Sequence, residues 1–321
     1  MPVTATDRPL LDALVPEVER LTERHLAATK EWFPHEVVPW SRGRDFEPGT
    51  EWDPSEVVLP DAVRSALVVN LLTEDNLPYY FRTIETTFDA DGPWGYWARR
   101  WTAEEGRHSI AIRDYLTVTR AVDPTSLERD RMAQVTCGEV PIPQSAADGL
   151  AYVALQELAT RISHFNTGKA INDPAGYTVM KRVAADENLH YLFYRDLVTA
   201  ALEIDPSTTI LAIERQVREF EMPGTGITNF GEHAVAIAKA GIYDLQIHHE
   251  QILVPVVLMH WGVEKAEGLS PEAEEARVAL VKRIDRIGRA GRRVAARWAE
   301  DAAAAADADG GSKPASLRVA G

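Results

Sequence analysis

Two short motifs of the form Glu-x-x-His constrain the fold of this chain more than any other feature of its sequence. The first is Glu105 and His108 in "TAEEGRHSIA", and the second is Glu187 and His190 in "AADENLHYLF". Residues three apart on an α-helix lie on one face, so each motif places a carboxylate beside an imidazole. Taken alone, such a pair is a salt bridge, a hydrogen-bonded surface pair or a pair of metal ligands.

Each motif follows a glutamate that lies in a largely apolar helical segment. Glu74 stands in "NLLTEDNLPYY", 31 residues before Glu105, and Glu157 stands in "AYVALQELATRISH", 30 residues before Glu187. Two helical arms of about 13 residues, joined by a loop of about 4, would return the chain to the same height. The spacing therefore predicts two antiparallel helix pairs, each offering one glutamate and one Glu-x-x-His motif at one level.

Four glutamates and two histidines in one helical bundle are the ligand set of a carboxylate-bridged site for two iron or two manganese ions. Two divalent cations balance four carboxylates, which could not be buried together without them. Carboxylate and imidazole ligands favour iron in a site that activates oxygen. The alternative is a chance repeat of common residues. We predict two iron ions per chain, cycling between Fe2+ and Fe3+, with manganese as a substitute, on Glu74, Glu105, His108, Glu157, Glu187 and His190.

A further acid precedes the glutamate of each motif. Glu104 and Asp186 each stand four residues before a histidine of the motif on their own helix. Carboxylates that hold ligand histidines in one tautomer are expected around such a site. The alternative is that both are ordinary acids on a helix surface.

Composition limits the class of protein. The chain has 321 residues, 45% hydrophobic and 26% charged, which is typical of a soluble globular protein. Its start lacks a basic segment followed by an apolar run, and no later stretch is long enough to span a bilayer, so we expect a cytoplasmic protein. The single cysteine, Cys137, cannot form an intramolecular disulfide. The net charge of −15 argues against general nucleic-acid binding.

One segment near the end of the chain is strongly basic despite the acidic total. Residues 282–297 contain one acidic residue, Asp285, and seven basic ones. The basic residues are Lys282, Arg283, Arg286, Arg289, Arg292, Arg293 and Arg297. Spacings of three and four gather much of this charge along one stripe of a helix. The stripe is either a solvated face or a docking surface for an acidic partner.

Helical periodicity dominates the chain, and no run of alternating strands with hairpin turns is present, so we predict an all-α protein. Pro78 is expected to kink one long helix. We expect an extended lead-in over residues 34–60 and a low-complexity, disordered tail over 301–321. The expected helices span residues 9–32, 62–88, 93–122, 146–170, 177–204, 207–220, 230–242, 244–261 and 271–299.

Several segments resemble the soluble acyl-acyl-carrier-protein (acyl-ACP) desaturases, the stearoyl-ACP desaturase family. "WTAEEGRH" is similar to that family's "WTAEENRH", and "ADENLH" to its "ADEKRH"; "LTEDNLP" and "LQELATRISHFNTGK" match the other two ligand helices. The resemblance covers most of residues 50–300 and is nearest to the actinobacterial members. It implies a ferritin-like di-iron helical bundle with additional helices, forming one domain over residues 1–300.

The resemblance also implies roles for particular residues. One iron would take Glu74, Glu105 and His108, the other would take Glu157, Glu187 and His190, and Glu105 and Glu187 would bridge the two. Thr160 matches a threonine of the active site, and Trp101 a tryptophan beside the cluster. Trp52, together with His108 and Asp186, matches a route for electrons from the surface to the iron; the alternative is that Trp52 only anchors the lead-in.

The activity implied is an O2-dependent di-iron desaturase that introduces a cis double bond into an acyl chain on acyl-carrier protein. A ferredoxin or similar donor would supply electrons, and the protein would be a homodimer. Lys282, Arg286, Arg289, Arg292 and Arg293 are the candidate dock for the acidic carrier protein, with Arg99, Arg100 and Lys169 as the alternative. Two other functions stay open: another di-iron oxygenase or oxidase of the same bundle, and a non-catalytic paralogue that binds acyl-ACP or iron.

This chain departs from the family pattern at several positions. Gly106, Asn188 and Leu189 replace residues of the two motifs that are not ligands. Three threonines, Thr83, Thr86 and Thr87, stand where the family lines part of its acyl channel. Chain length and double-bond position therefore stay open.

Overall fold

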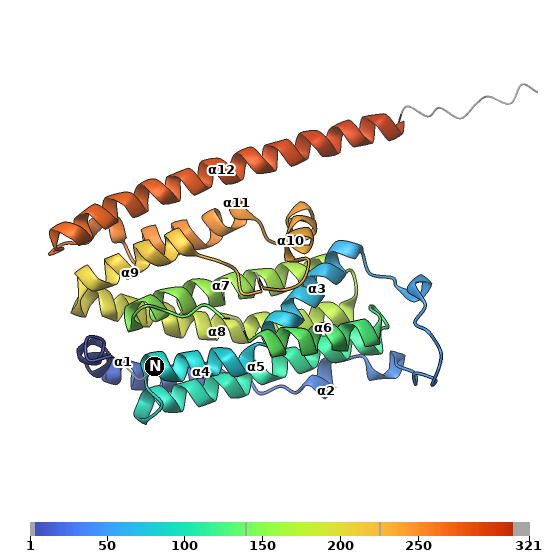
Figure 1. Cartoon of the computed structure of the whole chain (residues 1–321), viewed down its shortest axis with the longest axis horizontal. Coiled ribbons are helices and arrows are strands. Elements are labelled where there is room, and N and C mark those ends of the chain that lie inside the picture. Colours follow the sequence, from blue (N-terminus) through green and yellow to red (C-terminus); the bar gives the residue numbers. More distant parts are fainter. Residues whose placement is uncertain (1–3, 139, 225, 311–321) are drawn as a thin grey trace, which may run out of the picture.

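A computed structural model describes residues 4–138, 140–224 and 226–310, with side chains described as far as residue 300. Within these ranges the regular elements are all helices and no strand occurs, so the all-α prediction is confirmed. Several long helices run side by side as a bundle, and a second layer of helices, which includes the longest one, covers one side of it (Figure 1).

Four helices form the centre of the bundle: α3 (Asp61–Glu74), α5 (Gly92–Val118), α7 (Ala146–Ala170) and α8 (Pro174–Ile204). α7 and α8 form a hairpin, and α3 and α5 pack against it. The hairpin turn is short because Asp173 accepts hydrogen bonds from the first backbone N–H groups of α8, and Pro174 suits the first helical position. These four helices are the two antiparallel pairs that the glutamate spacing predicts.

The N-terminal helix α1 (Arg8–Ala28) packs on α5 and α8. Its buried stripe is Leu11, Leu14, Val18 and Leu21, followed by His25 at the next position of the same stripe. A histidine in the core of a helix interface needs a polar partner. α1 therefore brings one buried polar group toward the central helices.

The long helix expected over residues 62–88 is in fact two helices. α3 ends at Glu74, and α4 (Leu77–Phe88) begins after a break at Asp75 and Asn76. Pro78 lies in the first turn of α4, and because it has no N–H it cannot bond the carbonyl of Glu74. Pro78 thus ends α3 at Glu74 instead of kinking a continuous helix.

Two other parts of the chain are more helical than predicted. The lead-in contains a short helix, α2 (Pro34–Val37), and two 3₁₀ turns, η1 (Trp40–Arg42) and η2 (Pro54–Glu56). Helix α6 (Pro124–Cys137) was not predicted, because its sequence is mostly polar and it buries only Leu127 and Gln134. Asp123 caps its first turn, which was the available signal.

The second layer comprises α9 (Pro206–Glu219), α10 (Phe230–Lys239), α11 (Leu245–His248), the π-helix η3 (His249–His260), the 3₁₀ turn η4 (Val263–Lys265) and α12 (Pro271–Gly310). The α-helix expected over residues 244–261 is mostly π-helical, with Pro255 inside it. α12 is the outermost helix (Figure 1).

The predicted tail needs one correction. α12 continues to Gly310, so residues 301–310 belong to a helix instead of a structureless segment, while residues 311–321 lie outside the described part of the chain. None of the described helices is long and apolar enough to cross a membrane. α12 packs on α9, which packs on α7 and α8. The predicted single domain over residues 1–300 is consistent with this packing within the described residues.

Candidate metal centre

The six predicted ligands come together in the middle of the four central helices. Glu74 lies at the end of α3, and the remaining five lie inside α5, α7 and α8. All six side chains are buried: Glu74, Glu105, His108, Glu157, Glu187 and His190. We call these six residues the cluster.

The cluster divides into two overlapping groups of potential ligand atoms, each within 4.8 Å of one another. Glu105 and Glu187 belong to both groups. The first group adds Glu74 and His108, and the second adds Glu157 and His190. This arrangement provides two neighbouring positions for cations with two carboxylates between them, which matches the bridging expected from the family resemblance.

The atoms that face the interior of the cluster are close but not hydrogen-bonded. Nδ1 of His108 lies 3.0 Å from Glu105 Oε2 and 3.1 Å from Glu187 Oε1, and Nδ1 of His190 lies 2.8 Å from Glu105 Oε1. Even so, among the residues that the structure describes, neither Nδ1 atom has a hydrogen-bond partner, and nor does Oε2 of Glu157. Buried polar groups that converge without pairing fit a site built for metal ions.

Electrostatics lead to the same conclusion. Burial and the neighbouring Glu187 raise the pKa of Glu157 well above its usual value, and the same two causes raise that of Glu105. Burial alone would lower the pKa of His108 and of His190, but Glu105 and other carboxylates raise both well above the usual value. Without metal, the cluster must hold extra protons, and two divalent cations can take their place.

The two additional acids hold the histidines, but with exchanged partners. Asp186 on α8 lies 3.3 Å from Nε2 of His108 on α5, and Glu104 on α5 lies 2.9 Å from Nε2 of His190 on α8. Spacing along one helix pairs each acid with the histidine four residues after it, whereas the family resemblance already groups Asp186 with His108. The side chains meet across the helix pair because both lie on the face that α5 and α8 share. Each carboxylate can only accept, so Nε2 carries the hydrogen, and Nδ1 is left to bind a metal ion once it gives up its own proton.

Each of these carboxylates also accepts bonds from outside the cluster. Asp186 accepts from the indole of Trp32 at 2.9 Å and from Arg107 at 2.9 Å. We call His108, Asp186, Trp32 and Arg107 the Asp186 flank.

Glu104 accepts from Nε2 of His25 at 2.8 Å and is ion-paired with Arg100. We call His190, Glu104, His25 and Arg100 the Glu104 flank. In both flanks, burial of the carboxylate would raise its pKa. The hydrogen bonds that it accepts outweigh this effect, so the pKa of Asp186 and the pKa of Glu104 are both lowered.

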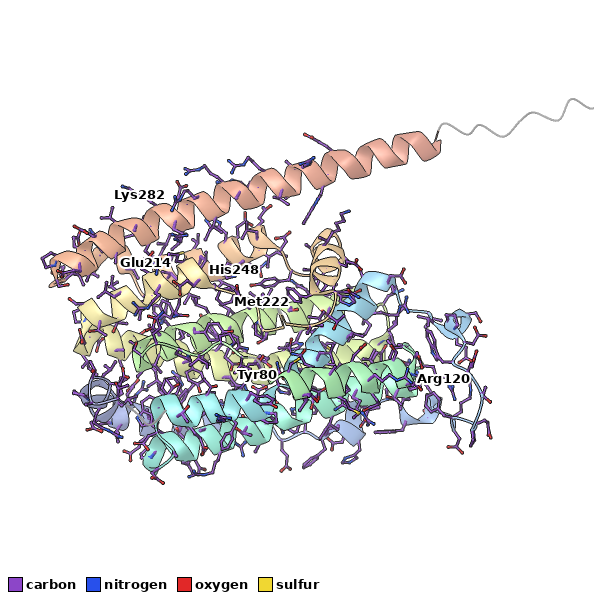
Figure 2. All side chains as sticks on the ribbon, viewed as in Figure 1. Tyr80, Arg120, Glu214, Met222, His248 and Lys282 are labelled. Carbon is purple, nitrogen blue, oxygen red and sulfur yellow. The ribbon has the colours of Figure 1, made fainter. Side chains whose placement is uncertain are left out.

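Trp52 does not lie where the predicted electron route needs it. Its indole donates to the backbone carbonyl of Arg120 at 3.0 Å, and Arg120 lies beyond the end of α5, away from Tyr80 (Figure 2). The tryptophan that contacts Asp186 is Trp32. The sequence could not distinguish them, since both stand in the tryptophan-containing segment before α3 and only the path of that segment decides which one reaches α5 and α8.

The two outer glutamates of the cluster are each held by one donor. Trp101 donates to Glu157 at 3.0 Å, so it lies beside the cluster as the resemblance implies. Nε2 of His164 lies 3.0 Å from Glu74, a contact that was not predicted. The signal was present, because Glu157, Thr160 and His164 follow one another at the spacing of a single helix face.

Thr160 lies between two acceptors. Its hydroxyl is 2.7 Å from Glu187 Oε2 and 3.1 Å from the backbone carbonyl of Glu157. The single hydroxyl hydrogen can serve only one of them at a time. The shorter contact is the one to the cluster, so Thr160 can orient a bridging carboxylate.

Two cavities reach the cluster. The first, which we call the distal arm, lies between α4 and α7 and is lined by residues that include Tyr80, Thr83, Thr87, Gly149, Tyr152 and Gln156. The other, which we call the second arm, lies under α10 and is lined by residues that include Asn70, Ser163, His164, Met222, Phe230 and Tyr243. Thr73, Glu74 and Thr160 line both arms. Figure 2 shows Tyr80 and Met222 near the middle of the molecule.

Two of the three threonines singled out in the sequence line the distal arm. They are Thr83 and Thr87, whereas Thr86 instead bonds the backbone carbonyl of Arg82 at 2.9 Å. The basic stripe lies elsewhere, on the outer helix α12, where Figure 2 shows Lys282. Its predicted members Lys282, Arg286, Arg289, Arg292 and Arg293 are exposed. Arg289 is paired with Asp285 on the same helix. The stripe therefore does not contact the cluster.

The sequence matches the fatty acid desaturase family over residues 6–309. It is 44% identical to a Mycobacterium tuberculosis protein with the provisional name acyl-ACP desaturase DesA1, covering 86% of this chain and 85% of that one. It is 30% identical to the chloroplastic stearoyl-ACP 9-desaturase 4 of Arabidopsis thaliana, covering 77% of this chain and 66% of that one.

A solved structure is similar as well. The X-ray structure of the provisionally named acyl-ACP desaturase DesA2 from Mycobacterium tuberculosis has a TM-score of 0.68 with this chain. The two are 30% identical in sequence, and the match covers 84% of this chain and 99% of the other. The expectation of a desaturase-like helical bundle is thereby confirmed.

Proposed function

Because this chain belongs to the fatty acid desaturase family, a family of oxidoreductases, we propose that it introduces a cis double bond into a fatty acyl chain on acyl-carrier protein. The observation that carries the proposal is a cluster of four buried carboxylates and two histidines at the meeting point of two cavity arms. Two bound iron ions would supply O2-dependent removal of two hydrogen atoms from adjacent methylene carbons, with water as the other product.

The protein's own residues would hold the metals and position the substrate. Glu105 and Glu187 would bridge two ions, iron in the first instance with manganese as a substitute. An acyl chain that occupies both arms would pass beside Thr73, Glu74 and Thr160, because these residues line both. Fixing one carbon–carbon bond at that junction and excluding water from it is the protein's main contribution.

Electrons would come from a ferredoxin or a similar small redox protein. We propose the route through Trp32, Asp186 and His108, since these three are linked by hydrogen bonds from the segment between α1 and α2 to the cluster. Trp32→Phe should slow reduction of the iron by ferredoxin, with Trp52→Phe as the matched control. If both substitutions slowed reduction equally, or if neither slowed it, Trp32 would be removed from the route.

The acidic carrier protein would dock on the basic stripe of α12, where complementary charge steers encounter. Reversing Arg289, Arg292 and Arg293 to glutamate should weaken acyl-ACP binding at low salt, whereas reversing the exposed Lys181 and Arg182 should not. Unchanged affinity in the first variant would move the dock elsewhere.

We propose a homodimer that uses the outer face of α5. Tyr96 and Ile110 support it because each is 50% exposed on that helix. Light scattering on the purified protein tests it, and a monomeric mass would contradict it.

The deciding experiment is aerobic incubation of the iron-loaded protein with ferredoxin, its reductase and a panel of acyl-ACPs, followed by mass spectrometry of the acyl products. We expect an acyl chain two hydrogens lighter. Consumption of O2 without alkene from any acyl-ACP would favour another oxygenase or oxidase, and no consumption would favour a non-catalytic paralogue.

Thr160→Val supplies the matched control because it keeps shape and removes the hydroxyl. It should retain iron but form less alkene per O2 consumed, releasing hydrogen peroxide or water instead. An unchanged ratio would remove Thr160 from the reaction.

A further inference from the structure

The distal arm contains polar side chains that the reaction of a plain hydrocarbon does not use. Four of them make no hydrogen bond within the part of the chain that the structure describes: Thr83, Thr87, Tyr152 and Gln156. Tyr152 is 9% exposed, and its hydroxyl oxygen is sealed from solvent. A buried hydroxyl without a partner is uncommon and indicates a missing partner.

The two threonines differ from others on the helices of this protein. A threonine inside a helix commonly bonds the carbonyl four residues earlier, which occupies its hydroxyl. Thr83 and Thr87 make no such bond, so their hydroxyls are available to the contents of the cavity. The bond is present at Thr86, Thr102, Thr117, Thr119, Thr167, Thr178, Thr199 and Thr209.

These polar groups lie beyond the cluster along the cavity. α4 starts just after Glu74, and at 1.5 Å per residue Thr83 and Thr87 lie about 9 and 15 Å along its axis from Leu77. α7 forms the opposite wall: a Cβ added to Gly149 would come within 2.9 Å of the Thr87 methyl. Tyr152 and Gln156 lie between Gly149 and Glu157 on that wall, so polar groups face the cavity from both sides.

An unsubstituted hydrocarbon in this arm would displace water and leave these groups unpaired. Such a loss opposes binding, whereas an oxygen atom on the chain could accept a hydrogen bond from a hydroxyl or the Gln156 amide. We propose that the distal arm selects an acyl chain that carries a hydroxyl or keto oxygen beyond the carbon atoms facing the cluster. This inference rests on the proposed function and names its substrate class.

The test compares two acyl chains of equal length on acyl-carrier protein, one unsubstituted and one with a mid-chain hydroxyl group on the side of the desaturated bond that lies in the distal arm. Dissociation constants and kcat/KM for alkene formation are measured for both. The iron-loaded wild-type protein should prefer the hydroxyacyl chain by roughly three- to tenfold, as expected for one or two neutral hydrogen bonds.

The variants Thr83→Val and Thr87→Val, alone and together, should reduce this preference toward one, since valine keeps the shape and removes the hydroxyl. Thr86→Val is the matched control, because it lies on the same helix but its hydroxyl is already bonded to Arg82. Tyr152→Phe should reduce the preference as well. Helicity and iron content are checked in each variant.

Three outcomes would overturn the inference: no preference in the wild-type protein, a preference unchanged by the double substitution, or an equal loss with Thr86→Val. Failure of the proposed function is recognised separately, because no acyl-ACP would then give an alkene. In that case the ratio of the two dissociation constants still decides whether the distal arm selects oxygenated chains.

Discussion

The Asp186 flank and the Glu104 flank follow one plan but are braced differently. On each, a carboxylate from one motif helix holds the histidine of the other and accepts an aromatic N–H from the N-terminal part of the chain. Arg107 is mostly buried, donates to the backbone of Trp32 as well as to Asp186, and lies over the Trp32 ring. Arg100, 34% exposed, reaches Glu104 from one turn earlier on the same helix.

The difference shows what the first 32 residues contribute. α1 supplies His25 and the segment between α1 and α2 supplies Trp32, one to each flank, so this part of the chain orients the histidines and does more than cover the bundle. If Trp32 is lost, Asp186 still has the mostly buried guanidinium of Arg107. If His25 is lost, Glu104 has only the partly exposed guanidinium of Arg100, so the Glu104 flank should be more sensitive to loss of its aromatic donor.

The largest expected effect is the loss of the residues that both halves of the cluster share. Glu105→Ala should reduce bound iron from about two per chain to below one, because both groups of ligand atoms include Glu105. Glu157→Ala should leave about one, because only one group includes Glu157. Iron is measured per folded chain after reconstitution, with helicity as the control. Equal iron in the two variants would mean that the halves do not share a centre.

The next effect concerns the exchanged partners. Glu104→Ala and Asp186→Ala should each weaken iron binding by about 10- to 100-fold, as found when groups that orient metal ligands are removed. Double-mutant cycles on iron affinity should couple Glu104 to His190 and Asp186 to His108. Coupling of each acid to the histidine on its own helix would restore the simpler interpretation of the sequence.

A smaller effect should separate the flanks. His25→Phe and Trp32→Phe each remove one hydrogen bond to a buried carboxylate but leave the carboxylate on its histidine, so each should lower iron affinity less than loss of the carboxylate itself. Because Arg107 remains beside Asp186, Trp32→Phe should lower iron affinity less than His25→Phe. Isothermal titration of the apo proteins with Fe2+ under anaerobic conditions gives both values, and the opposite order would reject the proposed difference in bracing.

The smallest effect should come from the outer arginine. Arg100→Gln removes a partly exposed ion pair, which is worth about 0–1 kcal/mol. Arg107→Gln removes a mostly buried guanidinium with three contacts and should cost more. Chemical denaturation of the metal-free proteins compares the two changes in the free energy of unfolding. Equal losses would show that burial of the arginine does not matter here.

The sequence predicted what depends on spacing along one helix. The positions of the six cluster residues follow from helical periodicity and from the matched intervals before Glu105 and Glu187. The contacts that it missed or misassigned arise between helices: the exchange of Glu104 and Asp186, and the approach of His25 and Trp32. These depend on how α1, α5 and α8 cross and on the path of the lead-in, which local spacing does not encode.

The fold shows the same limit. Amphipathic helices such as α1 and α9 were found near their true bounds, whereas α6 was missed because it buries very little. Pro78 was correctly identified as a break in the helical pattern, but the predicted kink was wrong, because one helix ends and another begins there. The π-helical turn around Pro255 has no separate signal, since its residues also fit an α-helical pattern.

The order of the cluster along the chain has a consequence for how the protein is made. Every residue of the cluster and of both flanks lies between His25 and His190, while three residues that line the second arm, Met222, Phe230 and Tyr243, come later. Synthesis proceeds from the N-terminus, so a nascent chain carries its complete ligand set before these later residues of the second arm have been made.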